Sequence, residues 1–138
     1  MSTDINKQFE DALKKEGVSL AEDAAADLAE EIYPLGTVVD LKKNRLAGIP
    51  GIEEIKEFRV VIIQRFAHEE GKPFYHTYGG VIYPVGTMGF DTVIYFGGDM
   101  IENVIQEGYK DDQDEAFVYL MKKELIVEKG LHSRKTGE

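Results

Sequence analysis

Three histidines, His68, His76 and His132, have side chains that could bind a metal ion or transfer a proton near neutral pH. Their spacing matches no zinc-binding signature. The chain contains no cysteine, which excludes disulfides, thiolate metal ligands and cysteine nucleophiles. We therefore interpret the histidines as surface or partly buried side chains, and we expect no metal site.

The acidic run Asp111-Asp112-Gln113-Asp114-Glu115 offers oxygen atoms that could bind calcium. An EF-hand loop needs glycine at its sixth position and glutamate at its twelfth. Counted from Asp111, these positions are Ala116 and Lys122, so the motif is absent. The run is instead typical of the acidic first turn of a helix, where the helix dipole favours negative charge.

Glycines at 79, 80, 86 and 89 resemble a nucleotide-binding loop only superficially. They fit neither the phosphate-binding nor the dinucleotide-binding pattern, and the chain has no G-x-S-x-G motif. The bends of a small, strongly curved sheet explain these glycines better than a nucleotide-binding loop does. The sequence thus predicts no catalytic residue and no cofactor, and we expect that the protein is not an enzyme.

Aromatic side chains crowd the middle of the chain, where they serve either as core residues or as a surface that binds another protein. The candidates for a partner surface are Tyr75, Tyr78, Tyr83, Phe90, Tyr95 and Tyr109.

The charge composition argues against some classes of binding partner. Acidic residues outnumber basic ones by 26 to 16, and the formal net charge of -10 disfavours nucleic acid and anionic membranes. The N-terminus lacks the features of a signal peptide, and no apolar run approaches the roughly 20 residues that span a bilayer. We expect a cytoplasmic protein whose partner is another protein, of basic character.

Hydrophobic periodicity predicts an α+β fold. The pattern predicts two N-terminal helices over 3–16 and about 20–32, one C-terminal helix over about 112–124, and about five strands over 37–42, 58–66, 74–83, 92–96 and 104–105. We expect the strands to form a small, strongly bent antiparallel sheet or partial barrel. The predicted organisation is a single domain over 1–138, with a helical extension over 1–32, a β-rich core plus C-terminal helix over 33–124, and a flexible tail over 130–138.

One phrase occurs twice, as Tyr33-Pro34-Leu35-Gly36-Thr37 and as Tyr83-Pro84-Val85-Gly86-Thr87. The residues that follow the two copies differ, which argues against an internal duplication. We interpret the copies as two similar turns, in which proline fixes φ at the corner and glycine relieves crowding at the exit.

The order of several short motifs resembles a known family. The motifs begin at Pro34-Leu35-Gly36-Thr37, Val60-Val61-Ile62-Ile63 and Tyr78-x-Gly80-Val81, and the last runs from Phe96 to Gly108-Tyr109. Residues about 33–120 resemble the bacterial domain of unknown function 4176, and 1–32 lie outside this resemblance. The chain departs from the family pattern in a longer loop over 43–57 and in Gly97-Gly98.

The resemblance implies a small protein of Gram-positive bacteria, of a kind often encoded near type VII secretion components. The family has no established catalytic residues. We therefore expect a non-enzymatic accessory or interaction protein, a chaperone-like or immunity-like partner of a type VII secretion substrate. The alternative is a module, enzymatic or not, that binds a small molecule or nucleotide in a cleft near the glycine pairs 79–80 and 97–98. A homodimer that buries the helices of 1–32 is a third hypothesis.

Overall fold

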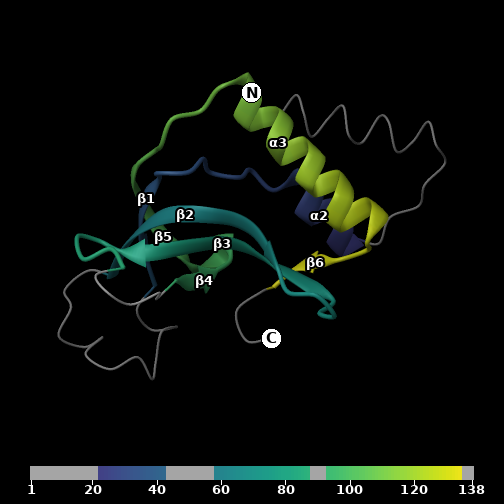
Figure 1. Cartoon of the computed structure of the whole chain (residues 1–138), viewed down its shortest axis with the longest axis horizontal. Coiled ribbons are helices and arrows are strands. Elements are labelled where there is room, and N and C mark those ends of the chain that lie inside the picture. The colour runs from purple at the N-terminus through teal and green to yellow at the C-terminus, as the bar shows by residue number, and fades with distance from the viewer. Residues whose placement is uncertain (1–21, 43–57, 88–92, 135–138) are drawn as a thin grey trace. The chain divides into compact units, whose positions relative to one another are not determined.

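The computed structural model describes residues 22–42, 58–87 and 93–134 (Figure 1). The chain forms two compact units. The first comprises Met1–Ile32, Glu69–Tyr75 and Lys110–Ser133, and the second comprises Tyr33–His68, His76–Tyr109 and Arg134–Glu138. The helix predicted over 3–16, the loop over 43–57 and Phe90 lie outside the described residues. The single domain predicted over 1–138 stays a prediction.

The second unit is built on an antiparallel sheet whose strands follow the order β4-β3-β2-β1-β5. The strands are β1 (Val38–Leu41), β2 (Phe58–His68), β3 (Phe74–Ile82), β4 (Ile94–Phe96) and β5 (Ile101–Gln106). Figure 1 shows β2 and β3 running side by side as the longest strands. All five strands were predictable from β-branched and aromatic runs, within a few residues at each end.

One face of this sheet carries the core of the second unit. Val39 lies opposite Val60 and Leu41 lies opposite Phe58. Residues opposite each other in adjacent strands point to the same face, so these four side chains pack together, and all of them are buried. The other face carries the ion pair between Asp40 and Arg59, with Nε of Arg59 2.8 Å from Oδ1 of Asp40.

Strand β2 changes its buried face near its C-terminal end. Phe66 has φ of 56°, a left-handed conformation that bulky residues rarely adopt. Around it the alternation of buried and exposed residues breaks, and the neighbours Arg65 and Phe66 are both buried. A local kink of this kind, like a β-bulge, re-aims side chains within a long strand.

The sheet is open rather than a barrel, because β4 and β5 lie at the two ends of the strand order. Strand β5 is irregular. Its pairing with β1 shifts register twice, between Val38 and Val39 and again between Asp40 and Leu41. Such bulges disrupt the regular backbone ladder that another strand would need at a sheet edge. The partial-barrel alternative of the sequence prediction is therefore wrong, and the antiparallel sheet is confirmed, whereas its strong bend stays a prediction.

The first unit contains α2 (Glu22–Ala29) and α3 (Asp112–Lys122), followed by the π-helical segment η4 (Lys123–Glu128). The α3 helix begins as the acidic run predicts, since the carboxylate of Asp111 accepts a hydrogen bond from the backbone of Asp114 at 3.0 Å. The sequence predicts three helices, but the described residues hold α3 as the longer helix and only two turns of α2. The helix count of the prediction is thus not confirmed.

The C-terminal segment also differs from the prediction. Residues 130–138 are predicted as a flexible tail, yet β6 (His132–Ser133) pairs in parallel with Phe74 and Tyr75 of β3. A buried carboxylate fixes this strand: Asp27 accepts hydrogen bonds from the backbone of Ser133 at 2.9 Å and from its hydroxyl at 2.6 Å. No local pattern reveals a contact between residues so far apart in sequence.

Lys122 is a charged residue that is buried in the first unit. Lysine side chains are seldom fully buried, so this position is not expected from the sequence. Its Nζ donates to the carbonyl oxygens of Leu28 at 2.8 Å and Glu30 at 2.6 Å. Carbonyls at a helix C-terminus lack partners within the helix, and Lys122 supplies a donor there. Burial lowers the pKa of Lys122 from 10.5 to about 8, against the opposing charges of Glu30, Asp27 and Glu31.

No helix in the described parts of the chain is long and apolar enough to cross a membrane.

The lowered pKa of Lys122 predicts how stability depends on pH. Between pH 8 and 10.5 the unfolded chain keeps the lysine proton that the folded chain has lost, so the free energy of unfolding should rise with pH. We expect the free energy of unfolding to rise more with pH in the wild type than in Lys122→Met, which lacks the titrating group. Urea unfolding from pH 7 to pH 11 measures both curves. Lys123→Met, at an exposed neighbour, is the matched control and should follow the wild type. Parallel curves for the wild type and Lys122→Met would contradict the assignment.

Candidate protein-interaction site

The first copy of the repeated phrase forms a tight turn in the second unit, just before β1. Gly36 has φ of 86°, which favours glycine, and Pro34 is buried. The buried hydroxyl of Thr37 donates to the carbonyl of Pro34 at 2.7 Å. The turn is tied to β2 by two backbone hydrogen bonds, from Gly36 to Ile62 at 2.8 Å and from Ile62 to Thr37 at 2.9 Å.

The residues after β5 lie directly against this turn. The backbone N–H of Gly108 donates to the hydroxyl of Thr37 at 3.0 Å. A Cβ atom at Gly108 would collide with the carbonyl oxygen of Leu35 and would lie 2.9 Å from the nitrogen of Thr37. Only glycine fits, because backbone atoms cannot move aside as a flexible side chain can. We call the two segments Tyr33–Thr37 and Gly108–Tyr109 the clasp.

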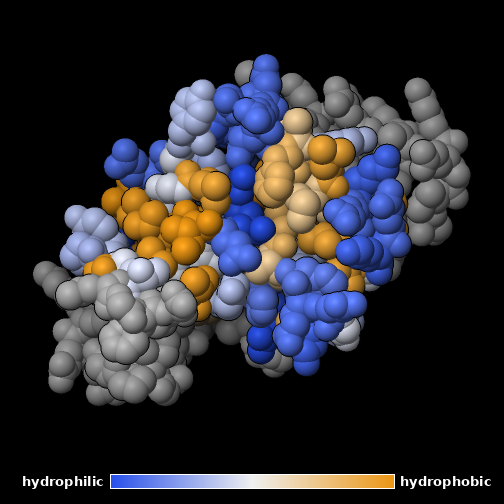
Figure 2. Space-filling view, in the orientation of Figure 1, coloured by the Kyte–Doolittle hydropathy of each residue, from blue (hydrophilic) through white to orange (hydrophobic). Residues whose placement is uncertain are grey.

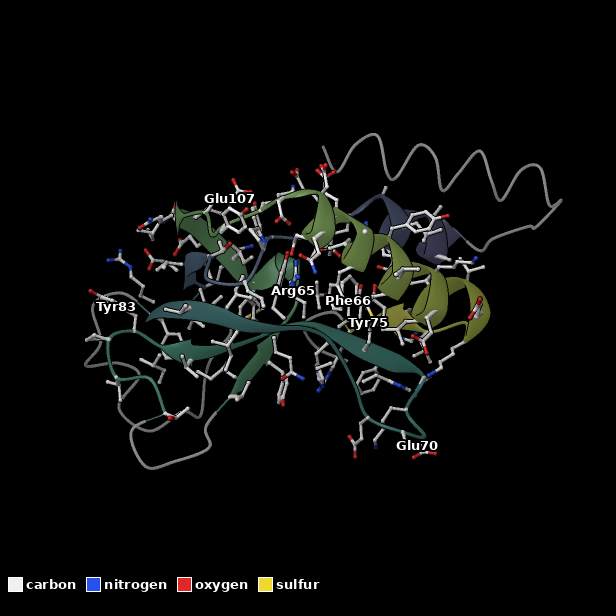
Figure 3. The ribbon with its side chains drawn as sticks, turned by 45° about the horizontal axis from the view of Figure 1, so that its top comes forward. Arg65, Phe66, Glu70, Tyr75, Tyr83 and Glu107 are labelled. Carbon is white, nitrogen blue, oxygen red and sulfur yellow. The ribbon has the colours of Figure 1, made fainter. Side chains whose placement is uncertain are left out.

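Buried polar groups support the clasp from within the second unit. The hydroxyl of Tyr78, on β3, accepts a hydrogen bond from the backbone of Tyr33 at 3.0 Å. Arg65 donates to the carbonyl of Tyr33 at 3.4 Å, and Figure 3 shows its side chain extending from β2. The Tyr78 ring also packs against Phe96 of β4, with centroids 5.5 Å apart. Three strands thus hold the clasp in place.

The clasp presents apolar side chains to solvent. Tyr109, which directly follows Gly108, is 80% exposed, and Leu35, within the turn, is 50% exposed. On the adjoining strand β5, Val104 and Ile105 are exposed as well. Figure 2 shows a further group of hydrophobic residues where β2 and β3 run in Figure 1, whereas β5 lies behind these strands in that view. We call Leu35, Val104, Ile105 and Tyr109 the β5 surface. It is an edge of the sheet, because Val104 and Ile105 are consecutive in β5 and point to opposite faces.

Two acidic side chains accompany these apolar residues along β5 and just after it. Glu102 and Glu107 are exposed, and residues 101–109 contain no lysine or arginine. Val104 lies opposite Val39, so it continues the apolar face of the sheet to its edge. The β5 surface therefore combines exposed apolar side chains with acidic neighbours.

The aromatic residues predicted as a partner surface do not form one surface. Tyr75 and Tyr78 are buried core residues, which corrects the prediction for both, and Phe90 is not described. Tyr83, Tyr95 and Tyr109 are exposed, but Tyr95 is on β4 and Tyr109 follows β5, at opposite edges of the sheet. Figure 3 shows Tyr83 projecting away from the end of β3.

The three histidines, which were considered as metal ligands, do not come together in a metal-binding group within the described ranges. Within the described ranges, no three histidine or acidic side chains form a group that could hold a metal ion. His76 packs against Tyr95 with ring centroids 4.9 Å apart, and His132 lies 6.4 Å from Phe74. All three histidines are half-buried.

The glycine pair at 79–80 is closely surrounded by other atoms. A Cβ atom at Gly80 would collide with the side chain of Val60 and lie 2.8 Å from the backbone oxygen of Val61. A Cβ atom at Gly79 would meet Val93 at 3.0 Å and the ring of Tyr95 at 3.2 Å. Both glycines allow close packing, so neither observation supports a ligand-binding cleft at this pair.

Sequence reasoning missed Leu35, Val104 and Ile105 as surface residues. The sequence shows both the glycine-tyrosine pair at 108–109 and the turn phrase at 33–37. No local sequence pattern indicates that these two segments lie against each other.

Comparison with known protein families identifies the family of this chain. Residues 32–117 match the family described as Domain of unknown function (DUF4176), and the chain belongs to this family. The match covers the clasp and all five strands of the antiparallel path. Comparison with curated proteins and with solved structures gave no match.

The two copies of the turn phrase provide a matched test of the clasp. Thr37→Val removes the hydroxyl that joins Pro34 to Gly108 and should lower the free energy of unfolding by about 1–3 kcal/mol. Thr87→Val makes the same change at the exposed threonine of the second copy and should cost less than about 0.5 kcal/mol. Denaturant unfolding of both variants measures the difference, and equal losses would contradict the bridging role of Thr37.

Proposed function

We propose that this protein is a non-enzymatic interaction protein that binds a protein partner through the β5 surface. The observation that carries the proposal is Tyr109, an aromatic side chain that is 80% exposed and directly follows Gly108, whose N–H donates to the hydroxyl of Thr37. An exposed aromatic side chain grouped with exposed aliphatic ones is typical of surfaces that bind other proteins.

The rigidity of the clasp favours binding. A partner loses less free energy when it binds side chains whose backbone is already ordered. Tyrosine is also enriched among the residues that contribute most to protein interfaces, because it offers a large contact area with few rotatable bonds. Leu35 lies in the turn that Gly108 packs against, and it supplies an exposed aliphatic side chain beside the segment that carries Tyr109.

The chemistry of the partner follows from the charges. Glu102 and Glu107 accompany the apolar residues, and the whole chain carries a net charge of -10. Complementary charge speeds association and disfavours partners of like charge. The bulges of β5 disfavour the addition of a regular strand to the sheet edge. The proposed partner is therefore a basic protein that contacts the β5 surface mainly through side chains.

Family membership supports a finer proposal. We propose that the partner is a type VII secretion substrate and that the protein acts in the cytoplasm, as chaperone or immunity protein. This step rests on the resemblance of the motifs to the family and on its setting in Gram-positive bacteria.

Two substitutions of matched exposure test the β5 surface. Leu35→Asp places a charge on the β5 surface, whereas Val85→Asp places the same charge at a site that is 51% exposed, compared with 50% for Leu35. We expect affinity capture from the native organism, quantified by mass spectrometry, to recover one specific partner with the wild type and with Val85→Asp. Leu35→Asp and Tyr109→Ala should reduce recovery at least about 10-fold, the effect of a single interface residue worth more than 1.4 kcal/mol.

Circular dichroism and thermal unfolding must show that both variants fold. The proposal is wrong if a specific partner binds Leu35→Asp and Tyr109→Ala as well as it binds the wild type. Loss of the partner with Val85→Asp alone would move the binding site to the turn after β3.

A further inference from the structure

The α3 helix of the first unit exposes an apolar stripe that the proposed function does not use. Phe117 is 41% exposed and Leu120 is 61% exposed, and Ala116 beside them is exposed too. These residues are three and four positions apart, so they lie on one face of the helix. The opposite face carries the buried residues Val118 and Lys122. Figure 2 shows hydrophobic residues over the part of the view in which Figure 1 labels α3.

Two exposed charges of opposite sign border the stripe at its ends. A third charge, Glu124, lies four positions after Leu120 and pairs with Lys129 at 3.6 Å. Asp112 lies in the first turn of α3 and Lys123 directly follows its last residue. Three turns of an α-helix take about 10.8 residues, so positions 112 and 123 lie on the same side of the helix. The stripe therefore has an acidic end and a basic end along one border.

This arrangement is complementary to itself. When two copies of α3 pack antiparallel across a two-fold axis near Phe117, the same border of each helix faces the other. Asp112 of one copy then lies near Lys123 of the second, twice by symmetry, while Phe117 and Leu120 pack between them. The helix dipoles also oppose each other in this arrangement. A two-fold interface needs such a self-complementary surface.

We propose that the exposed stripe of α3 binds a second copy of this chain, forming an antiparallel two-fold dimer. The dimer is weak. One short helix from each copy offers less contact than the roughly 1,200–2,000 Å² of a stable complex. The net charge of -10 on each copy opposes association further. We expect a dissociation constant on the order of 0.1–1 mM at physiological salt, where the Debye length of about 8 Å limits repulsion between distant charges.

The experiment is sedimentation equilibrium of the full chain from micromolar to millimolar concentration. The wild type should shift from monomer to dimer, and Leu120→Asp should weaken the dimer at least about 10-fold, as expected for a charge in an apolar interface. Val85→Asp, at an exposed valine of the second unit outside the β5 surface, is the matched control and should dimerise like the wild type. Circular dichroism verifies that each variant folds.

A charge exchange tests the antiparallel arrangement itself. Asp112→Lys and Lys123→Asp should each weaken the dimer by about 2- to 10-fold, since each exposed pair contributes little and two pairs are lost. The double variant Asp112→Lys with Lys123→Asp restores both pairs and should recover most of the affinity. A double variant as weak as the single ones would overturn the antiparallel arrangement. A wild type that stays monomeric at every concentration, or a dimer unaffected by Leu120→Asp, would overturn the proposal.

Discussion

The second unit depends on the close approach of two backbone segments, at Gly108 and at the turn over 33–37. Hydrogen bonding and steric exclusion act together there. Thr37 uses one hydroxyl group both to close its own turn and to accept the N–H of Gly108, while the absence of a Cβ at Gly108 lets the chains meet. A hydroxyl is suited to this position because it donates and accepts at the same time. The segment after β5 is thereby fixed to the segment before β1.

This constraint bears on the partner binding that we propose for the β5 surface. The regular ladder between β1 and β5 is interrupted twice, so the ladder alone would hold the end of β5 poorly. The clasp makes up for this weak pairing directly after β5, next to Tyr109. Mobility at this point would impose an ordering cost on every partner, and the clasp removes most of that cost before binding.

The sequence predicts the elements of this fold better than their contacts. All five antiparallel strands and α3 follow from periodicity, whereas β6 and the burial of Lys122 do not. The reason is that strands and helices report their own local pattern, while β6 depends on Asp27, more than a hundred residues away in sequence. The burial of Tyr78 has a similar cause, because its hydroxyl finds a partner only at the distant backbone of Tyr33.

The two turn phrases show most directly why the site could not be located from sequence. Both copies place glycine at positive φ, as the shared residues require, yet Thr37 is buried and Thr87 is exposed. The difference lies in Gly108, which has no counterpart at the second turn among the described contacts. The family match spans this whole arrangement but ends at residue 117, within the stripe of α3. The clasp is therefore the feature that we expect other members to share, whereas self-association through Leu120 and Lys123 is proposed for this chain alone.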